Sequence, residues 1–497
     1  PMSDTTVAAS SDLPPAALLP HSRKMTIFAL LMLTIFMAMI DVQVVSTALP
    51  AIISDLHGAE RIGWITAAYM LAQCATMPIY GKLGDMFGRK PVLLFAVVLF
   101  LIGSLACGVA PDINWLIAAR VLQGLGGGGV MVSVFSVNAD LFEPRERAKY
   151  QSFTSLVLMC AASIGPALGG TLTQIWGWRS IFLINLPIGA IVILGLAFLL
   201  PRRRKYVRRK IDVAGAVTLT IAIISIVMLA DVQQVFEGHA LLGAAGLAAL
   251  ALVSLLLWVR FEQRAAEPII PLSLFQNRSF LLLLLIGAAN GAIAIGLVNY
   301  HAIYLQLSTG LAPAKAGLFF IAITFGMAIG SLIAGQVISR TGRLRELLLI
   351  GMGFASLGLC VLAYLPAGQT SYAVVGAVMM GIGFSNGLVQ QSPVIGVQAE
   401  APRKDMGAAT GAVTLLRIAG AAVAVSVYGA IVSAHLESAG SPGLEGLRAE
   451  VAGGGPGALA AEALVSTTYH MLYLTSAGIA LAGLILAILL PRKRLAA

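Results

Sequence analysis

The sequence GKLGDMFGRKPVLL at Gly81–Leu94 has a counterpart in GQVISRTGRLRELL at Gly335–Leu348. Each stretch begins with glycine, has a Gly-Arg pair seven residues later, and ends with two leucines that enter the next apolar segment. Each follows the second apolar segment of its part of the chain. The match indicates an internal repeat of six segments, a plan typical of transporters that bind substrate near the membrane midplane.

Fourteen apolar segments lie between Met25 and Leu490, and each can cross a hydrocarbon core about 30 Å thick. Because the membrane core offers no water to backbone groups, we expect these segments to be helices. The repeat pairs segments one to six with nine to fourteen and leaves seven and eight as an insertion. The predicted spans lie near Met25–Leu49, Ile62–Tyr80, Pro91–Ala110, Trp115–Ala139, Tyr150–Thr173, Ser180–Leu200, Asp212–Asp231, His239–Trp258, Ser279–Tyr300, Ala314–Ile338, Leu347–Leu365, Ser371–Val397, Met406–Val432 and Tyr469–Leu490.

The predicted fold is therefore an all-α polytopic membrane protein with two six-helix bundles and two inserted helices, about 14 transmembrane helices in all. A composition of 58% hydrophobic and 11% charged residues cannot cover the surface of a soluble protein of 497 residues. The predicted divisions are a disordered cytoplasmic tail (1–24), an N-terminal six-helix bundle (25–200), a basic loop with the inserted helices (201–278), a C-terminal six-helix bundle (279–490) and a cytoplasmic tail (491–497).

The distribution of basic residues predicts the orientation. With the N-terminus inside, 26 of the 32 Lys and Arg residues fall in cytoplasmic segments, four in outer loops and two within spans. This bias predicts that both termini are cytoplasmic. The net charge of +10 could suggest nucleic acid, but the densest basic cluster, at Arg202–Lys210, is expected at the cytoplasmic membrane surface.

Four stretches in the first half follow the order of motifs in a known family: MIDVQVVSTALP (Met39–Pro50), GKLGDMFGRK (Gly81–Lys90), LIAARVLQGLGGG (Leu116–Gly128) and SIGPALGG (Ser163–Gly170). The chain thereby resembles the fourteen-span drug:proton antiporter branch of the major facilitator superfamily, the EmrB/QacA group, over roughly Met25–Leu490. One position departs from the family pattern, because Met86 replaces the usual basic residue. In the second copy Ser339 stands where Asp85 stands in the first, as often happens in this superfamily.

Asp41 is the one carboxylate well inside a span of the first half. A charge in the membrane core is costly, so it should face a partner or a cavity. Arg120 is expected at nearly the same depth, and the two residues are predicted to pair. The resemblance implies that Asp41 exchanges a proton and that Arg120 favours its ionised form in one conformation; an aspartate that only holds helices together is the alternative.

Two further motifs are expected to control conformational change. Pro166 interrupts the hydrogen-bond ladder of its span, and Gly165, Gly169 and Gly170 permit close helix contact. The resemblance implies that this stretch acts as an outer hinge and marks export, while a generic kinked helix is the alternative.

Near the cytoplasmic surface, Gly81 and Gly88 suit a tight turn. The resemblance implies a latch here, in which Asp85 caps a helix of the other half and Arg89 pairs with Asp140. A loop that only anchors the topology through its positive charge is the alternative.

Polar residues inside the spans predict a substrate cavity. Asn138 lies five helical turns after Arg120 on one face, with Gly124, Gly127 and Met131 between them. We expect Asn138 to line a cavity, and the glycines either to line it or to pack helices. The second half contributes Asn290, Asn386, Gln390, Gln391 and Arg417, of which Arg417 either contacts substrate or braces a helix.

The sequence predicts a proton-coupled exporter of amphipathic or cationic compounds that works by alternating access. An exporter of lipids or glycolipids with the same fold, and a non-transporting scaffold, stay open as alternatives. No cofactor, metal or enzymatic activity is expected, because the glycine run Gly124–Gly129 follows no strand and no nucleotide-binding loop or nucleophile–base pair is visible. We expect a monomer in a bacterial inner membrane, and the outer loop Ser433–Thr468 is either a linker or a docking element for an adaptor.

Overall fold

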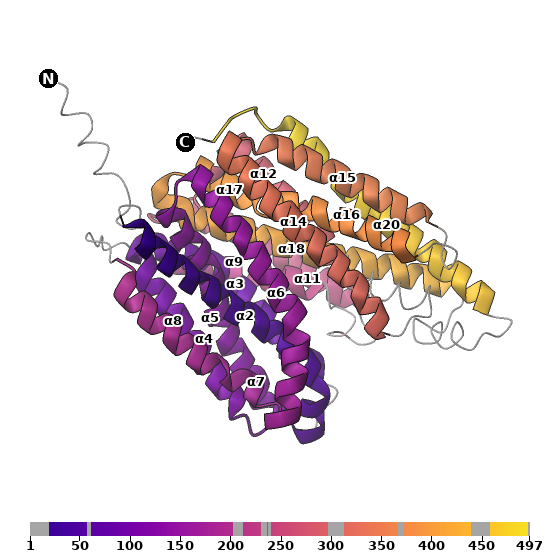
Figure 1. Cartoon of the computed structure of the whole chain (residues 1–497), viewed down its shortest axis with the longest axis horizontal. Helices are drawn as coiled ribbons and strands as arrows, with labels where there is room; N and C mark the ends of the chain where they lie inside the picture. The colour runs from indigo at the N-terminus through magenta and orange to yellow at the C-terminus, as the bar shows by residue number, and fades with distance from the viewer. Residues whose placement is uncertain are drawn as a thin grey trace.

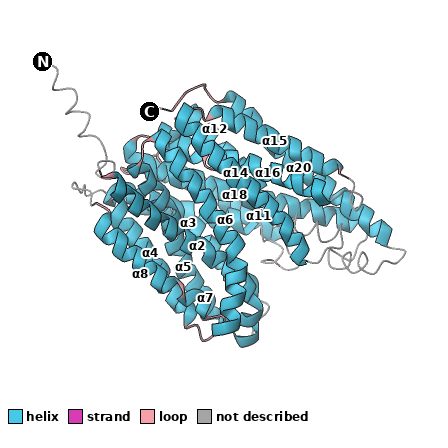
Figure 2. Cartoon of the chain, viewed as in Figure 1, coloured by secondary structure: helices cyan, strands magenta, loops and turns pink. Residues whose placement is uncertain are grey.

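The computed structural model describes residues 19–56, 61–201, 212–229, 236, 240–296, 313–365, 372–438 and 458–495, and these residues are helical with short connections and no strands (Figure 2). The first half contains α2 (His21–Leu56), α3 (Ile62–Phe87), α4 (Arg89–Gly108), α5 (Ile113–Leu141), α6 (Pro144–Trp176), α7 (Ser180–Leu183) and α8 (Asn185–Leu199). The inserted helices are α9 (Val213–Met228) and α11 (Ala240–Glu262), followed by η3 (Leu272–Gln276). The second half contains α12 (Arg278–Gly291), η4 (Ala292–Gly296), α14 (Pro313–Thr341), α15 (Arg345–Tyr364), α16 (Tyr372–Gln390), α17 (Ser392–Glu400), η5 (Arg403–Asp405), α18 (Met406–Ser438) and α20 (Ala458–Leu489).

The described helices account for the fourteen predicted spans. Eleven of them are long and apolar enough to cross a membrane by length and composition. The remaining three spans correspond to α3, which carries charges near its end, and to α9 and α12, which are shorter. The chain is a multi-pass membrane protein, as predicted.

Helix packing follows the internal repeat. In the first half α2 packs against α6, and α5 packs against both α3 and α4. The corresponding pairs in the second half also pack: α12 with α18, and α16 with both α14 and α15. Similar residues at equivalent positions thus produce two bundles of the same plan, seen in indigo to magenta and in orange to yellow in Figure 1.

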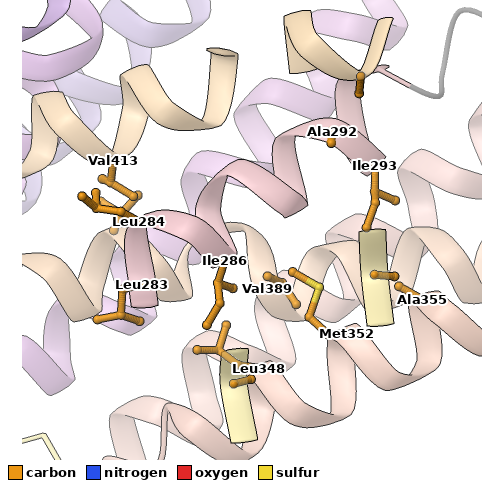
Figure 3. Packing of buried hydrophobic residues seen from close by; sticks show 14 of the residues in the cluster. Leu283, Leu284, Ile286, Ala292, Ile293, Leu348, Met352, Ala355, Val389 and Val413 are labelled. Carbon is orange, nitrogen blue, oxygen red and sulfur yellow. The ribbon is translucent and has the colours of Figure 1, made fainter. Parts of the chain in front are cut away.

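The second bundle is held together by an apolar core. Ile286 of α12 lies beside Leu348 and Met352 of α15 and Val389 of α16 (Figure 3). These four side chains are at most 2% exposed. Burying a large aliphatic side chain of this kind stabilises a protein in water by about 1.5–3 kcal/mol, whereas in a membrane close packing supplies the attraction.

The two halves meet where α3 packs against α18 and α6 packs against α14, and we call this interface the seam. In Figure 1, α6 lies beside α14. The end of the first bundle at α7 and the end of the second bundle at the start of α20 point away from each other. The inserted helix α9 packs against both α3 and α18 and so contacts both sides of the seam.

Two predicted boundaries are wrong. Helix α2 begins at His21, so the predicted tail (1–24) is helical over its last four residues, and residues 1–18 lie outside the described part. The predicted outer loop Ser433–Thr468 is shorter, because α18 continues to Ser438 and α20 begins at Ala458. Each helix extends past its hydrophobic stretch, since the backbone hydrogen-bond ladder does not end where apolar residues end.

Candidate functional site

Asp41 lies in the interior of the first bundle and has three polar partners. Its Oδ2 atom lies 2.6 Å from Nη1 of Arg120, and neither side chain is exposed. Its Oδ1 atom accepts hydrogen bonds from Nε2 of Gln123 at 2.8 Å and from Nδ2 of Asn185 at 2.9 Å. The contact with Arg120 that was predicted from matching depths is present.

The Arg120 guanidinium is held from several sides. Its Nε atom donates to the carbonyl of Ile65 at 3.2 Å, and Nη1 also donates to Oε1 of Gln123 at 2.6 Å. The guanidinium carbon lies 4.3 Å from the centre of the Tyr69 ring, a favourable cation–π distance. Removing one partner of such a buried pair leaves an uncompensated charge, at a cost of about 3–5 kcal/mol in proteins.

Sequence reasoning missed Gln123, Asn185, Ser104 and Tyr69. The Asn185 Nδ2 and Gln123 Nε2 atoms both donate to Oγ of Ser104, at 2.8 and 3.1 Å, so the hydroxyl bridges the two amides that hold Asp41. Gln123 could have been found, because it lies three residues after Arg120 and shares its helix face. Asn185 begins α8, far from Asp41 in the sequence, and no spacing in the sequence indicates that the two residues are in contact.

The predicted latch residues are also in contact. The carboxylate of Asp85 accepts hydrogen bonds from the backbone amides of Gly407 and Ala408, both at 3.0 Å, at the start of α18. Arg89 lies 2.6 Å from Asp85 and 3.4 Å from Asp140. A carboxylate at a helix N-terminus satisfies free amides and interacts favourably with the helix dipole. Asp85 thus ties the first half to the second at the seam.

The two latch glycines have different roles, and the prediction of a turn holds for only one. Gly88 joins α3 to α4 with φ of +92°, a backbone conformation that favours glycine. Gly81 lies inside α3, and a Cβ there would collide with the carbonyl of Gly407. Gly81 is required for the close approach of α3 and α18 because no side chain fits between the two backbones.

The stretch Ser163–Gly170 lies in α6, with Pro166 inside the helix. A Cβ on Gly165 would meet the Gln43 side chain, and one on Gly169 would meet the backbone of Val44, so both glycines pack against α2 of the same half. Nothing lies within 4 Å of a Cβ on Gly170. The prediction that Gly170 permits close helix contact is therefore wrong for the conformation described.

On α5, the glycines pack helices. Gly124 approaches the backbone of Tyr69, and Gly127 approaches its hydroxyl group. Met131 is buried against Met77 in an apolar cluster, while Asn138 is 1% exposed and has no hydrogen-bond partner for either amide atom among the described residues. On the predicted face of α5, Asn138 thus has two buried polar atoms without partners among the described residues, and Arg120 has one, Nη2.

The polar residues of the second half fall into separate groups. Asn290 donates to Asn386 at 3.3 Å. Gln390 and Gln391 both lie 3.4 Å from Oγ of Ser155 on α6, so they contact the other half across the seam. Arg417 stands apart, and its Nε and Nη1 atoms are buried with no partner among the described residues.

Arg147 is a seam contact that the sequence analysis missed. Its Nη1 atom donates to Oε1 of Gln398 in the second half at 3.1 Å, and Nη2 donates to the carbonyls of Ala139 and Phe142 at the end of α5. The carbonyls that end a helix attract a cation, which helps to explain how this arginine is buried without an ion pair among the described residues. Like Asp85, it joins the halves at the cytoplasmic end predicted from the charge distribution.

The repeated bundles, the apolar helices and the buried charge pair define a polytopic membrane protein of the transporter type. The family model described as Major Facilitator Superfamily matches residues 31–425. The chain belongs to the major facilitator superfamily.

Its relatives include named multidrug proteins of Bacillus subtilis. Multidrug resistance protein 3 is 32% identical over 81% of this chain and 78% of its own length. Multidrug transporter protein MdtP is 30% identical over 84% of this chain and 76% of its own length. Among solved structures, the human organic anion transporter MFSD10 superposes with a TM-score of 0.62 over 94% of this chain and all of its own chain, at 14% identity, which shows a shared fold alone.

Proposed function

We propose that this protein is a secondary exporter that exchanges inward-moving protons for amphipathic or cationic compounds. The observation that carries the proposal is the buried Asp41 carboxylate, held by Arg120, Gln123 and Asn185 from two other helices. A carboxylate is a group that binds and releases protons, and hydrogen-bond donors or a positive charge beside it favour its ionised form. Multidrug relatives support export as the direction.

The coupling follows from charge. Ionised Asp41 balances Arg120 and accepts the two amide hydrogen bonds that hold α5 and α8 against α2. A proton on Asp41 removes its charge and weakens all three contacts. Because α2 packs on α6 and α6 forms the seam with α14, a shift of α2 is transmitted to the seam. The latch at Asp85 then opens or closes the cytoplasmic end in step with protonation.

The proposal includes a location. The bias of basic residues supports cytoplasmic termini, and the multidrug relatives in a bacterium support a bacterial cytoplasmic membrane. We propose a monomer that uses the proton gradient without a cofactor.

A lipid or glycolipid exporter is the second candidate. The observation in its favour is the sequence of the second half, where every Asp and Glu lies at a helix end or between spans. Lipophilic cations would find no acid there. A non-transporting scaffold would have no use for a buried proton-exchanging pair.

The test is substrate-induced proton release in inside-out membrane vesicles, over lipophilic cations, neutral drugs and lipids. Release with one class of compound, lost in Asp41→Asn, supports the proposal. Transport that runs equally well without a proton gradient contradicts it.

A further inference from the structure

Three charged side chains lie well inside the predicted spans: Asp41, Arg120 and Arg417. The first two form an ion pair with no exposed side-chain surface, so their charges cancel. Arg417 forms no ion pair among the described residues. The net fixed charge deep in the helices is therefore a single positive charge, at Arg417.

The acids nearest to Arg417 in the sequence lie far from it along the chain. Arg417 lies eleven residues after the start of α18, about 16 Å along its axis. The acids before and after it, Asp405 and Glu437, are about 18 Å and 30 Å away along the helix at 1.5 Å per residue. The rest of the second half carries acids only at helix ends and between spans.

The space beside Arg417 is provided by Gly291 of α12. A Cβ on Gly291 would lie 2.9 Å from Cγ of Arg417 and would collide with the Arg417 carbonyl. The missing side chain lets the arginine stem lie against α12. Its guanidinium has two buried nitrogens, Nε and Nη1, that find no partner in the described part of the chain. An unpaired buried donor costs free energy, most of all when it is charged, unless a ligand supplies an acceptor.

Apolar side chains of both halves lie around the residue that follows Arg417. Ile418 packs against a cluster that contains Met77 and Met131 of the first half, and Met39 packs against the same cluster. Met77 and Met131 are at most 5% exposed, whereas Met39 and Ile418 are half-buried. Methionine side chains are flexible and polarizable, and they adapt to ligands of different shape. A positive charge followed along α18 by half-buried apolar side chains at the seam fits an amphipathic molecule with a negative end.

We propose that Arg417 binds the acidic group of an amphipathic anion, a carboxylate, sulfate or phosphate, whose apolar body lies on the half-buried side chains of Met39 and Ile418. The inference rests on the proposed export function. It narrows the proposed substrates from amphipathic or cationic compounds to amphipathic anions. An acidic oxygen accepts from Nε and Nη1 together, since the guanidinium fork matches the geometry of such groups. A lipophilic cation meets a like charge at this position.

The test is equilibrium binding to the purified full chain in phosphatidylcholine nanodiscs. The probes are three dansyl compounds with one undecyl chain that ends in a carboxylate, a carboxamide or a trimethylammonium group, and empty discs correct for partition into lipid. The wild type should bind the carboxylate at least tenfold more tightly than the other two. Arg417→Gln should lose this preference, and Arg417→Lys should keep part of it.

The exposed Arg260, in the last turn of α11, provides the matched control, and Arg260→Gln should bind all three probes like the wild type. Equal binding of the three probes by the wild type, or tightest binding of the trimethylammonium compound, overturns the proposal. So does an unchanged carboxylate preference in folded Arg417→Gln. If that variant does not fold, the wild-type comparison alone decides.

The same assay separates this inference from proton coupling. Binding is measured without a gradient, so the carboxylate preference should persist in Asp41→Asn even if coupled transport fails. Discs that also contain phosphatidylglycerol identify the source of the anion. Weaker probe binding in these discs shows that an anionic membrane lipid competes for the site. Unchanged binding shows that the site selects a soluble amphiphile. In both cases a preference for the carboxylate probe supports the site at Arg417.

Discussion

Asn185, the first residue of α8, donates a hydrogen bond from Nδ2 to Oδ1 of Asp41, 144 positions earlier in the chain, at 2.9 Å. The same Nδ2 atom reaches Oγ of Ser104 at 2.8 Å, and both side chains are fully buried. The sixth predicted span is thereby tied to the carboxylate of the first. A change in the protonation of Asp41 therefore alters contacts between α2, α5 and α8 at the same time.

Asp41→Asn should abolish proton-coupled transport. The amide of asparagine does not bind or release a proton near neutral pH, and Arg120 loses its counter-charge. We therefore expect at least a tenfold loss of substrate-induced proton release in inside-out vesicles. Asp55→Asn is the control, since Asp55 pairs with Arg179 where both side chains are more than 40% exposed. Full coupling in a folded Asp41→Asn protein would exclude Asp41 as the coupling residue.

Asn185→Ala should lower both the melting temperature and the rate of proton-coupled transport. The variant removes the hydrogen bond from Nδ2 of Asn185 to Oδ1 of Asp41, which ties α8 to α2. A hydrogen bond to a charged group contributes about 1.5–3 kcal/mol, so we expect a loss of this order in the free energy of unfolding. Ser104→Ala, which leaves the direct bond in place, should lower the melting temperature and the rate less; equal losses in both variants would contradict a direct effect of Asn185 on Asp41.

Asp85→Asn should favour opening at the cytoplasmic end. The variant weakens the cap on α18, worth about 1 kcal/mol, and leaves Arg89 with Asp140 alone. Spin labels at Trp176 and Tyr364, both 71% exposed at predicted outer helix ends, report the change as a shorter distance between the halves. Asp140→Asn should have a smaller effect, because Asp140 lies 3.4 Å from Arg89, farther than Asp85 at 2.6 Å. An unaltered distance distribution in Asp85→Asn would show that this residue does not hold the latch.

Gly81→Ala should prevent full closure of the seam. Its Cβ meets the Gly407 carbonyl, and backbone atoms on both sides cannot yield without separating α3 from α18. We expect a lower melting temperature and a transport rate reduced by tenfold or more. Gly478→Ala in α20, where nothing lies within 4 Å of the added Cβ, should leave both unchanged. A normal rate in Gly81→Ala would mean that this close approach is not needed for transport.

Much of this protein could be predicted from its sequence. Apolar length fixes the number of helices because the membrane core excludes unpaired backbone groups, and the repeat of Gly81–Leu94 in Gly335–Leu348 identifies the two halves. The contact between Asp41 and Arg120 was also accessible, since depth along a helix is proportional to residue number and a buried charge needs a partner.

The tertiary structure alone decided which distant side chains meet. Asn185 at Asp41, Arg147 at Gln398 and Gly81 at Gly407 depend on how helices rotate and cross, and periodicity says nothing about these angles when a helix is apolar on all faces. In a soluble protein the polar face would orient each helix. In this membrane protein, close packing of small residues and a few polar contacts set the orientation of each helix instead. Such contacts can be identified only when the positions of both helices are known.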